Sequence, residues 1–302
     1  MGKRRIFAFG DSFTVGEGAD LALTSQVLKV FKETNERDTR AASEVIRSIN
    51  LKLSWTQHLE NAFNIFVTNH GETGASNNTI FNKVFEVDAY TDFGPEDLVI
   101  VMWSSSVRDK LPFFPNNFQQ HGPIGAGWSL KELLGSDNEN LFSRRFIYDD
   151  ADGHYDKKYL QYIEKTLTPF MQSYFKEYLT NFHSNEYYNI VNLNYIKLLQ
   201  NYFKFKNTNY IMIDAFEQMN SFAKKQDKRW DEIDTTFYFG EGNTTIWDEL
   251  NKIGGDVWED RKLTVSPDGQ RCHPNKTGYK LIGEILEKYV KSNIKLYKKS
   301  TI

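Results

Sequence analysis

Short apolar runs that end at glycine or polar residues recur along the chain and predict buried strands. The predicted strands are Ile6 to Gly10, Ile65 to His70, Asp97 to Trp103, and Tyr210 to Phe216. Apolar positions at helical spacing occur between and after these runs, over residues 42–63, 186–204 and 275–297. Because strands alternate with helices, we expect an α/β protein with a parallel sheet that helices cover on both faces.

Two segments depart from this alternation. Residues 105 to 185 contain the loop-like "LPFFPNNFQQHGPIGAGWS", and residues 217 to 262 are charged and contain "FYFGEGNTTIWDEL". Long irregular stretches inside a compact domain are usually functional, so both are predicted to be insertions, the first of them a candidate lid. The whole chain, 1–302, is therefore predicted to be a single domain with two insertions.

Composition excludes several classes of protein. The 37 basic and 40 acidic residues give a net charge of -3, which is not the footprint of a nucleic-acid-binding protein. A single cysteine, Cys272, rules out an internal disulfide framework, and the histidines show no zinc-like clustering. The acidic stretch Asp149 to Asp156 lacks the spacing of a calcium loop, so no metal or other cofactor is expected. No apolar run is long enough for a secretory signal or a membrane span, which predicts a cytoplasmic or otherwise soluble protein.

The candidate chemistry lies where the first strand ends, in "FAFGDSFTVGEG". Ligands bind at the carboxyl ends of the strands in parallel sheets, and the strand ends there carry Gly10 to Ser12, His70, Ser104 and Asp214. A serine becomes a nucleophile only with a base in hydrogen-bond reach. The candidate base is His273, in "HPNKTGYKLI" near the end of the chain.

Three segments resemble, in order, the conserved blocks of the SGNH/GDSL hydrolase family: "FAFGDSFTVGEG", "NHGETGASNNTI" and "HPNKTGYKLI". The resemblance implies a flavodoxin-like, three-layer α/β/α sandwich and ester hydrolysis through an acyl-enzyme intermediate. It also implies that Ser12 is the nucleophile and His273 the general base. The backbone amides of Ser12 and Gly74 would then form part of the oxyanion hole.

The chain departs from the family's pattern at two places. The third block of the family is Gly-x-Asn-Asp, whereas this chain has "VIVMWSSSVRD", so Ser104 or Ser105 is the candidate replacement donor in the oxyanion hole. The triad aspartate of the family corresponds to Gln270 here, which makes Asp268, on a Pro-Asp-Gly turn, the candidate third member. A Ser-His dyad oriented by a backbone carbonyl is the alternative. The Trp-Ser-Ser-x-x-Arg variant resembles SGNH-like proteins of tailed phages, for which the virion is an alternative location.

The candidate substrate contacts are Asp11, Asn77, Trp103 and Arg108. Asp11 has an alternative role in holding its loop, and Arg108 has one in a salt bridge. By analogy with the family, esters of short acyl groups are expected as substrates, carbohydrate O-acetyl groups first among them.

Two other classes of function compete with the esterase. One is a binding or structural module that keeps the fold while its catalytic residues have been lost. The other is a nucleotide-binding domain, which is disfavoured because no Gly-x-Gly-x-x-Gly or phosphate-loop pattern follows the first strand.

Overall fold

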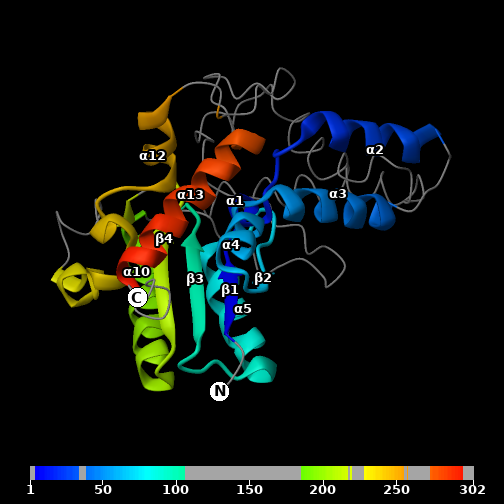
Figure 1. The fold of residues 1–302 in the computed structure, drawn as a ribbon. Coiled ribbons are helices and arrows are strands. Elements are labelled where there is room, and N and C mark those ends of the chain that lie inside the picture. The colour runs from blue at the N-terminus through cyan, green and yellow to red at the C-terminus, as the bar shows by residue number, and fades with distance from the viewer. Residues whose placement is uncertain are drawn as a thin grey trace, which may run out of the picture.

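A parallel sheet forms the centre of the molecule (Figure 1). The computed structural model describes residues 4–33, 39–105, 185–216, 218–219, 228–254, 257 and 273–294. The strands are β1 (Arg5–Phe9), β2 (Val67–Asn69), β3 (Asp97–Trp103) and β4 (Asn209–Asp214), and they lie in the order β2-β1-β3-β4. All their pairings are parallel, so the four strands expected from the sequence are confirmed with small shifts of their ends.

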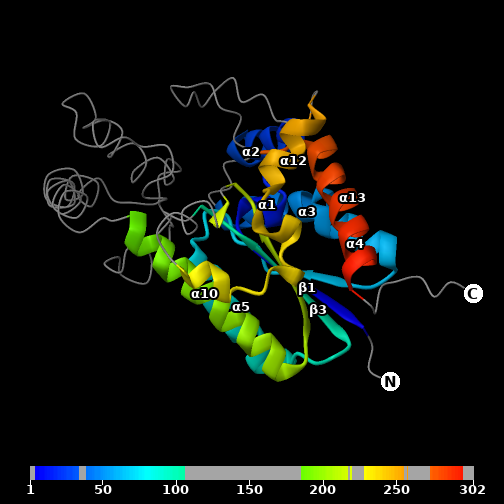
Figure 2. The ribbon, with the colours of Figure 1, turned by 90° about the vertical axis from the view of Figure 1, so that its left-hand side faces the viewer.

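Helices cover both faces of this sheet (Figure 2). One face carries α4 (Trp55–Phe63), α12 (Ile246–Ile253) and α13 (Lys276–Asn293), and the other carries α5 (Asn77–Thr91) and α10 (Asn185–Lys206). Successive side chains of a strand point to opposite faces, so alternate residues of β3 enter two different core clusters. The structure thus confirms an α/β protein with three layers, α/β/α, around a parallel sheet.

The helical stretch predicted over 42–63 is divided at Ser54. It forms α3 (Thr39–Leu53) and α4, and Ser54 between them has an extended backbone. The Ser54 hydroxyl donates to the carbonyl of Leu51 at 2.9 Å, which satisfies a group that the end of α3 leaves without a partner. The break directs Trp55 inward, where its indole N–H donates to the carbonyl of Phe13 at 3.1 Å.

Two further helices lie at the carboxyl edge of the sheet. The one-turn helix α1 (Ser12–Val15) follows β1 directly, and α2 (Leu21–Glu33) runs alongside α3. Figure 1 shows α2 and α3 projecting together from the body of the molecule. The sheet edge that was expected to carry the site is therefore followed directly by α1, while α2 and α3 extend to one side of it (Figure 1).

The described part of the second predicted insertion is packed into the core. It forms η4 (Lys228–Glu232), η5 (Thr235–Phe237), η6 (Phe239–Gly242) and α12. Tyr238 makes a parallel bridge with Met212 of β4 and is fully buried. Ile246 and Leu250 of α12 belong to the core cluster on the face of α13. The first predicted insertion, apart from its two end residues, lies outside the described residues, and so does the lid expected there.

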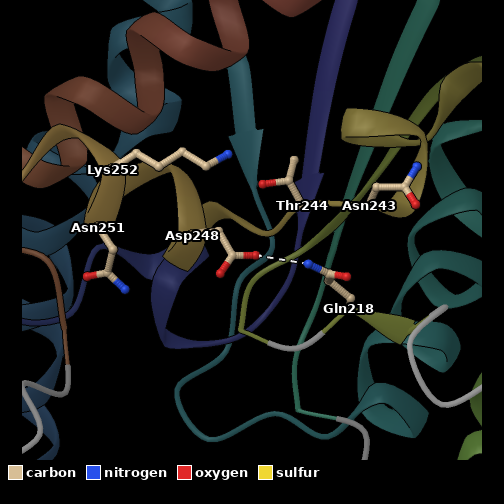
Figure 3. A pocket seen from close by; sticks show the side chains of 6 residues that line it. All are labelled: Gln218, Asn243, Thr244, Asp248, Asn251 and Lys252. Carbon is tan, nitrogen blue, oxygen red and sulfur yellow. Dashed lines mark hydrogen bonds between the residues drawn. The ribbon is translucent and has the colours of Figure 1, made fainter.

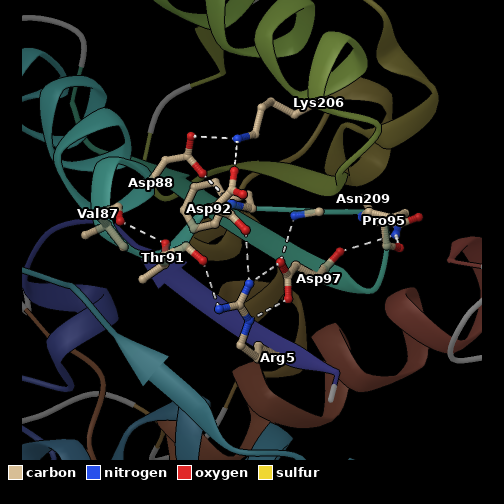
Figure 4. A network of polar contacts seen from close by, with 11 residues as sticks. Arg5, Val87, Asp88, Thr91, Asp92, Pro95, Asp97, Lys206 and Asn209 are labelled. Atoms are coloured by element: carbon tan, nitrogen blue, oxygen red, sulfur yellow. Dashed lines mark hydrogen bonds and ion pairs between the residues drawn. The ribbon is translucent and has the colours of Figure 1, made fainter. Parts of the chain in front are cut away.

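A network of charged groups holds the amino edge of the sheet, opposite α1 (Figure 4). The guanidinium of Arg5 donates to both carboxylate oxygens of Asp97, at 2.8 and 2.7 Å, and to the carbonyl of Thr91 at 3.0 Å. Lys206 of α10 reaches Asp92 at 2.5 Å. These contacts join the starts of β1 and β3 to the ends of α5 and α10, far from the residues that carry the candidate chemistry.

Candidate active site

Ser12 lies at the carboxyl edge of the sheet, immediately after the turn that leaves β1. A side chain at Gly10 would put its Cβ 2.0 Å from the hydroxyl of Thr14 and 2.9 Å from the carbonyl of Met102, so only glycine fits this turn. Asp11 caps α1, because its carboxylate accepts from the amide of Phe13 at 3.0 Å. The sequence Gly-Asp-Ser thus ends the strand and holds the serine at the first position of a helix.

The imidazole of His273 lies against this serine. Its Nε2 is 2.9 Å from Ser12 Oγ, although the two residues are 261 positions apart in the sequence. Asn275 caps α13 by accepting from the amide of Gly278 at 3.0 Å, which fixes the start of the helix that follows His273. The hydroxyl of Tyr279 donates to the carbonyl of Glu17 at 2.8 Å and so attaches α13 to the residues after α1. The structure therefore brings together the serine and the base predicted from the sequence.

Aromatic rings surround one side of this pair. The ring of Phe13 lies 5.9 Å from that of His273 and 4.5 Å from that of Phe216. Trp247 of α12 lies 6.1 Å from Phe216. Such apolar surroundings strengthen electrostatic interactions because they limit the access of water. The predicted third triad member, Asp268, lies outside the described residues.

A carboxylate that the sequence analysis did not anticipate also lies beside the imidazole. Glu17 Oε2 is 3.8 Å from His273 Nε2. The sequence contains one signal for the position of Glu17. Gly16 ends the short helix α1, and the turn that it forms directs the next residue back toward the helix.

The loop after β2 lies next to the turn that precedes Ser12 and carries Gly74. The amide of Glu72 in this loop donates to the carbonyl of Gly10 at 3.0 Å, and Gly74 has a φ of +74°, a left-handed conformation that favours glycine. Among the described residues, the amides of Ser12 and Gly74 donate to no protein acceptor. The N–H of Ser12 lies at the start of α1 and that of Gly74 in the loop bonded to Gly10, so both can serve a ligand oxygen at this edge.

Three residues predicted to contact the substrate or the oxyanion are hydrogen-bonded to one another or to the backbone at the site. Ser104 donates its hydroxyl to Asp11 at 2.6 Å, so its proton is directed at a carboxylate. The side-chain amide of Asn77 accepts from the amide of Ser104 at 2.8 Å and donates to its carbonyl at 3.2 Å. Asp11, Asn77 and Ser104 are all buried. These contacts hold the turns at the carboxyl edge of the sheet, and a role of these residues toward a substrate or an oxyanion stays a prediction.

The remaining predicted residues divide into two groups. Trp103 is buried in the core cluster between the sheet and the α5 side, and its contact with a substrate stays a prediction. Ser105 is buried at the end of the same strand. Arg108 lies outside the described residues.

His70 and Asp214, which were expected at the same edge, both contact aromatic side chains of the core. Asp214 is buried and accepts from the hydroxyl of Tyr238 at 2.5 Å. Burial and this carboxylate raise the pKa of Tyr238 well above its usual value. The ring of His70 stacks on that of Phe9 with 5.0 Å between centroids, and burial lowers the pKa of His70 to about 4.

A polar hollow of about 390 Å³ lies beside α12 (Figure 3). Its lining carries carboxamide, hydroxyl, carboxylate and ammonium groups, from Gln218, Asn243, Thr244, Asp248, Asn251 and Lys252. Gln218 donates to Asp248 at 3.3 Å across the hollow. Trp247, the neighbour of Asp248 in α12, belongs to the aromatic group beside His273, so one helix borders both the hollow and the surroundings of the nucleophile.

Within the described ranges, no three His, Cys, Asp or Glu side chains lie where they can together hold a metal ion. No helix in that part of the chain combines the length and the apolar character needed to cross a bilayer.

Comparisons with known proteins give structural neighbours only. No protein-family model matches the chain, and no curated protein matches it. The structure is similar to that of a lipolytic protein of the G-D-S-L family from Desulfitobacterium hafniense, at 14% identity and a TM-score of 0.35, over 93% of this chain and 97% of that one. It is also similar to a member of the lipolytic G-D-S-L family from Veillonella parvula, at 13% identity and a TM-score of 0.33, over 94% and 97% of the two chains. The function proposed next rests on the residues of the site.

Proposed function

We propose that this protein is a serine ester hydrolase of the SGNH/GDSL type. The observation that carries the proposal is the 2.9 Å contact between Ser12 Oγ and His273 Nε2. These residues come from the first and last of the three sequence segments that resemble the family, and a serine within hydrogen-bond reach of an imidazole is the minimal arrangement for nucleophilic catalysis. Gly74, from the middle segment, lies in the loop bonded to Gly10.

The geometry supports acyl transfer in two half-reactions. Ser12 Oγ attacks the ester carbonyl carbon while His273 Nε2 takes the hydroxyl proton. The amides of Ser12 and Gly74 donate to the oxyanion of the tetrahedral intermediate. The carbon–oxygen bond to the alcohol then breaks, and His273 gives its proton to the departing alcohol oxygen. Water repeats the sequence on the acyl-enzyme, which releases the carboxylic acid and restores Ser12.

Asp268 is proposed as the group that orients His273 from its other ring nitrogen. A carboxylate in that position holds the imidazole in the tautomer that accepts the serine proton, and removing it from a serine protease lowers turnover by about 10⁴. A backbone carbonyl in its place leaves a dyad. Asp268→Asn distinguishes the two arrangements, because we expect a loss of at least about 10²-fold in kcat for a triad and little change for a dyad.

The proposed substrates are esters of short acyl groups on a carbohydrate. The polar hollow beside α12 supports this choice, because carboxamides and a carboxylate form paired hydrogen bonds with neighbouring hydroxyl groups. Trp247 belongs to α12, the helix that borders the hollow, and its ring lies near those of Phe13 and Phe216 beside His273.

The test is hydrolysis of p-nitrophenyl acetate by the wild type, Ser12→Ala and His273→Ala, with labelling by a fluorophosphonate followed by intact mass. Ser292→Ala, at an exposed position of α13, is the matched control for serine removal. We expect the wild type and the control to turn over and take one label, and both site variants to lose activity.

Equal rates for all four proteins, with no label on any of them, would contradict the proposal. That result would favour the alternative, a binding or structural module on the same fold, and acetylated oligosaccharides would then be tested as ligands of the hollow.

A further inference from the structure

The backbone of Glu17 is fixed relative to the nucleophile. Helix α1 ends at Gly16, whose φ of +89° lies in the left-handed region. The amides of Gly16 and Glu17 both donate to the carbonyl of Ser12, each at 3.0 Å. The carbonyl of Glu17 accepts from the hydroxyl of Tyr279 at 2.8 Å. This helix-ending turn, stabilised by α13, keeps Glu17 beside Ser12 before any substrate binds.

The carboxylate of Glu17 occupies a position that differs from that of a triad acid. Its Oε2 lies 3.8 Å from His273 Nε2, the nitrogen that contacts Ser12, whereas a triad acid bonds to Nδ1. The side chain as a whole is 28% exposed but its Oε2 is buried, so water screens the charge only in part. This carboxylate therefore faces the reacting side of the imidazole.

The same position determines which part of an ester Glu17 approaches. Nε2 must come within hydrogen-bond distance of the alcohol oxygen to which it gives the proton. A group next to Nε2 is consequently next to the alcohol part of the substrate and not to the acyl chain. A negative charge there attracts a cationic alcohol group and repels an anionic one.

We propose that Glu17 sets the charge preference of the site for the alcohol part of its ester, favouring cationic over uncharged groups and uncharged over anionic groups. The inference rests on the proposed ester hydrolysis at Ser12. It makes Glu17 a specificity-determining residue, which the nucleophile and base alone do not require.

The test compares esters that differ in charge and little in shape. Acetylcholine and 3,3-dimethylbutyl acetate are such a pair, and the acetate ester of 3-hydroxypropanesulfonate supplies the anion. For the wild type at low ionic strength we expect kcat/KM to be roughly five- to tenfold higher for the cationic ester than for the neutral one, and lower still for the anion. Glu17→Gln should bring the three values together.

Glu284→Gln is the matched control, because it removes the same charge from an exposed position of α13 that pairs with Lys280. We expect this variant to keep the preference of the wild type. High salt gives a second measurement that needs no variant, since the wild-type ratio should fall toward one as the ionic strength rises from about 0.01 M to about 0.5 M.

Failure of the inference and failure of the proposed function differ in outcome. A wild type that hydrolyses the neutral ester with no charge preference overturns the role of Glu17 and leaves the esterase standing. An equal loss of preference in both carboxylate variants also overturns it, because the long-range field would then be responsible. A wild type that hydrolyses none of the esters and takes no fluorophosphonate label overturns both.

Discussion

Ser104 donates its hydroxyl to the buried carboxylate of Asp11 at 2.6 Å, and this contact joins the residues that follow β3 to those that follow β1. The other oxygen of that carboxylate accepts from the amide of Phe13 in α1. Ser104, one of the two serines predicted as an oxyanion donor, is thus bound to the residue that precedes Ser12. This contact positions the turn after β1, and the oxyanion role of Ser104 stays a prediction.

Ser104→Ala is expected to cost stability more than chemistry. Removing the donor leaves a buried carboxylate with one partner fewer, which destabilises a protein by about 1–3 kcal/mol. Turnover of an activated ester should fall by less than about tenfold, whereas loss of an oxyanion donor costs about 10²–10³-fold. Urea unfolding together with kcat separates the two roles, and Ser292→Ala, at an exposed position of α13, is the control. A hundredfold slower enzyme of unchanged stability would contradict the assignment.

Gly16→Ala is expected to destabilise the protein strongly. The added Cβ would lie 2.6 Å from the carbonyl of Asn50 and 2.8 Å from the Cβ of Ser54, and the residue would also be held at positive φ. The left-handed conformation alone costs a non-glycine residue about 1–2 kcal/mol, so the loss should exceed this value.

Two other glycines separate these causes. Gly254 has a φ of +67° with open space around its Cβ position, and Gly94 also has open space there but is not among the positive-φ residues of the described part of the chain. We expect unfolding free energies to decrease little for Gly94→Ala, more for Gly254→Ala and most for Gly16→Ala. A Gly16 variant as stable as the Gly94 variant would show that the turn adapts.

Acid should destabilise the protein through His70. Burial, with Lys83 and Arg47 nearby, lowers the pKa of the folded-state imidazole from 6.5 to about 4. The unfolded chain takes up this proton below about pH 6.5 while the folded chain does not, so stability falls as the pH decreases from 6.5 toward 4, by up to about 1.4 kcal/mol per pH unit. The loss of stability therefore begins near the unfolded-state pKa of 6.5 and ends near the folded-state pKa of about 4.

His70→Phe should remove this contribution, because phenylalanine retains the stacking on Phe9 and has no proton to bind. The measurement is urea unfolding of both proteins at several pH values. We expect their difference in unfolding free energy to be constant above about pH 7.5 and to shift in favour of the variant below pH 6.5. Parallel curves over the whole range would contradict the assignment.

Asp97→Asn should lower stability and leave the rate per folded molecule unchanged. Asp97 accepts two hydrogen bonds from Arg5 and one from the amide of Gly94 at 2.8 Å, all at the sheet edge opposite Ser12. Loss of the charge from this largely buried carboxylate should cost about 1–3 kcal/mol. Thermal unfolding and active-site titration measure the two quantities, with the exposed Glu86→Gln as the control. A change in kcat would show that the two edges are coupled.

Sequence patterns predicted the elements whose cause is local. The residues of β3 form a continuous apolar run because both faces of a parallel strand are buried, and Gly10 marks the strand end because no side chain fits there. The positions of Ser12 and His273 at one edge follow from these elements and from the helix that begins after Asn275.

Contacts between side chains and distant backbone groups were not predictable in the same way. The hydrogen bond between Asn77 and Ser104 joins residues 27 positions apart, and neither residue type indicates its partner. The place of Glu17 depends on where α13 presents Tyr279, and the break at Ser54 depends on space shared with Gly16. Each arises from packing between elements, which periodicity along one segment does not report.

The pairing of Ser12 with His273 has a consequence for synthesis on the ribosome. Translation delivers β1 and the nucleophile early, but His273 and Tyr279 emerge only with the last described helix. A nascent chain can form the sheet before His273 has been made. At that stage the face of the sheet on which Ile282 and Leu286 of α13 pack is still uncovered. The Ser12–His273 contact and the covering of that apolar face therefore form in the same late step, so a chain halted before it lacks the proposed catalytic pair and leaves apolar surface exposed.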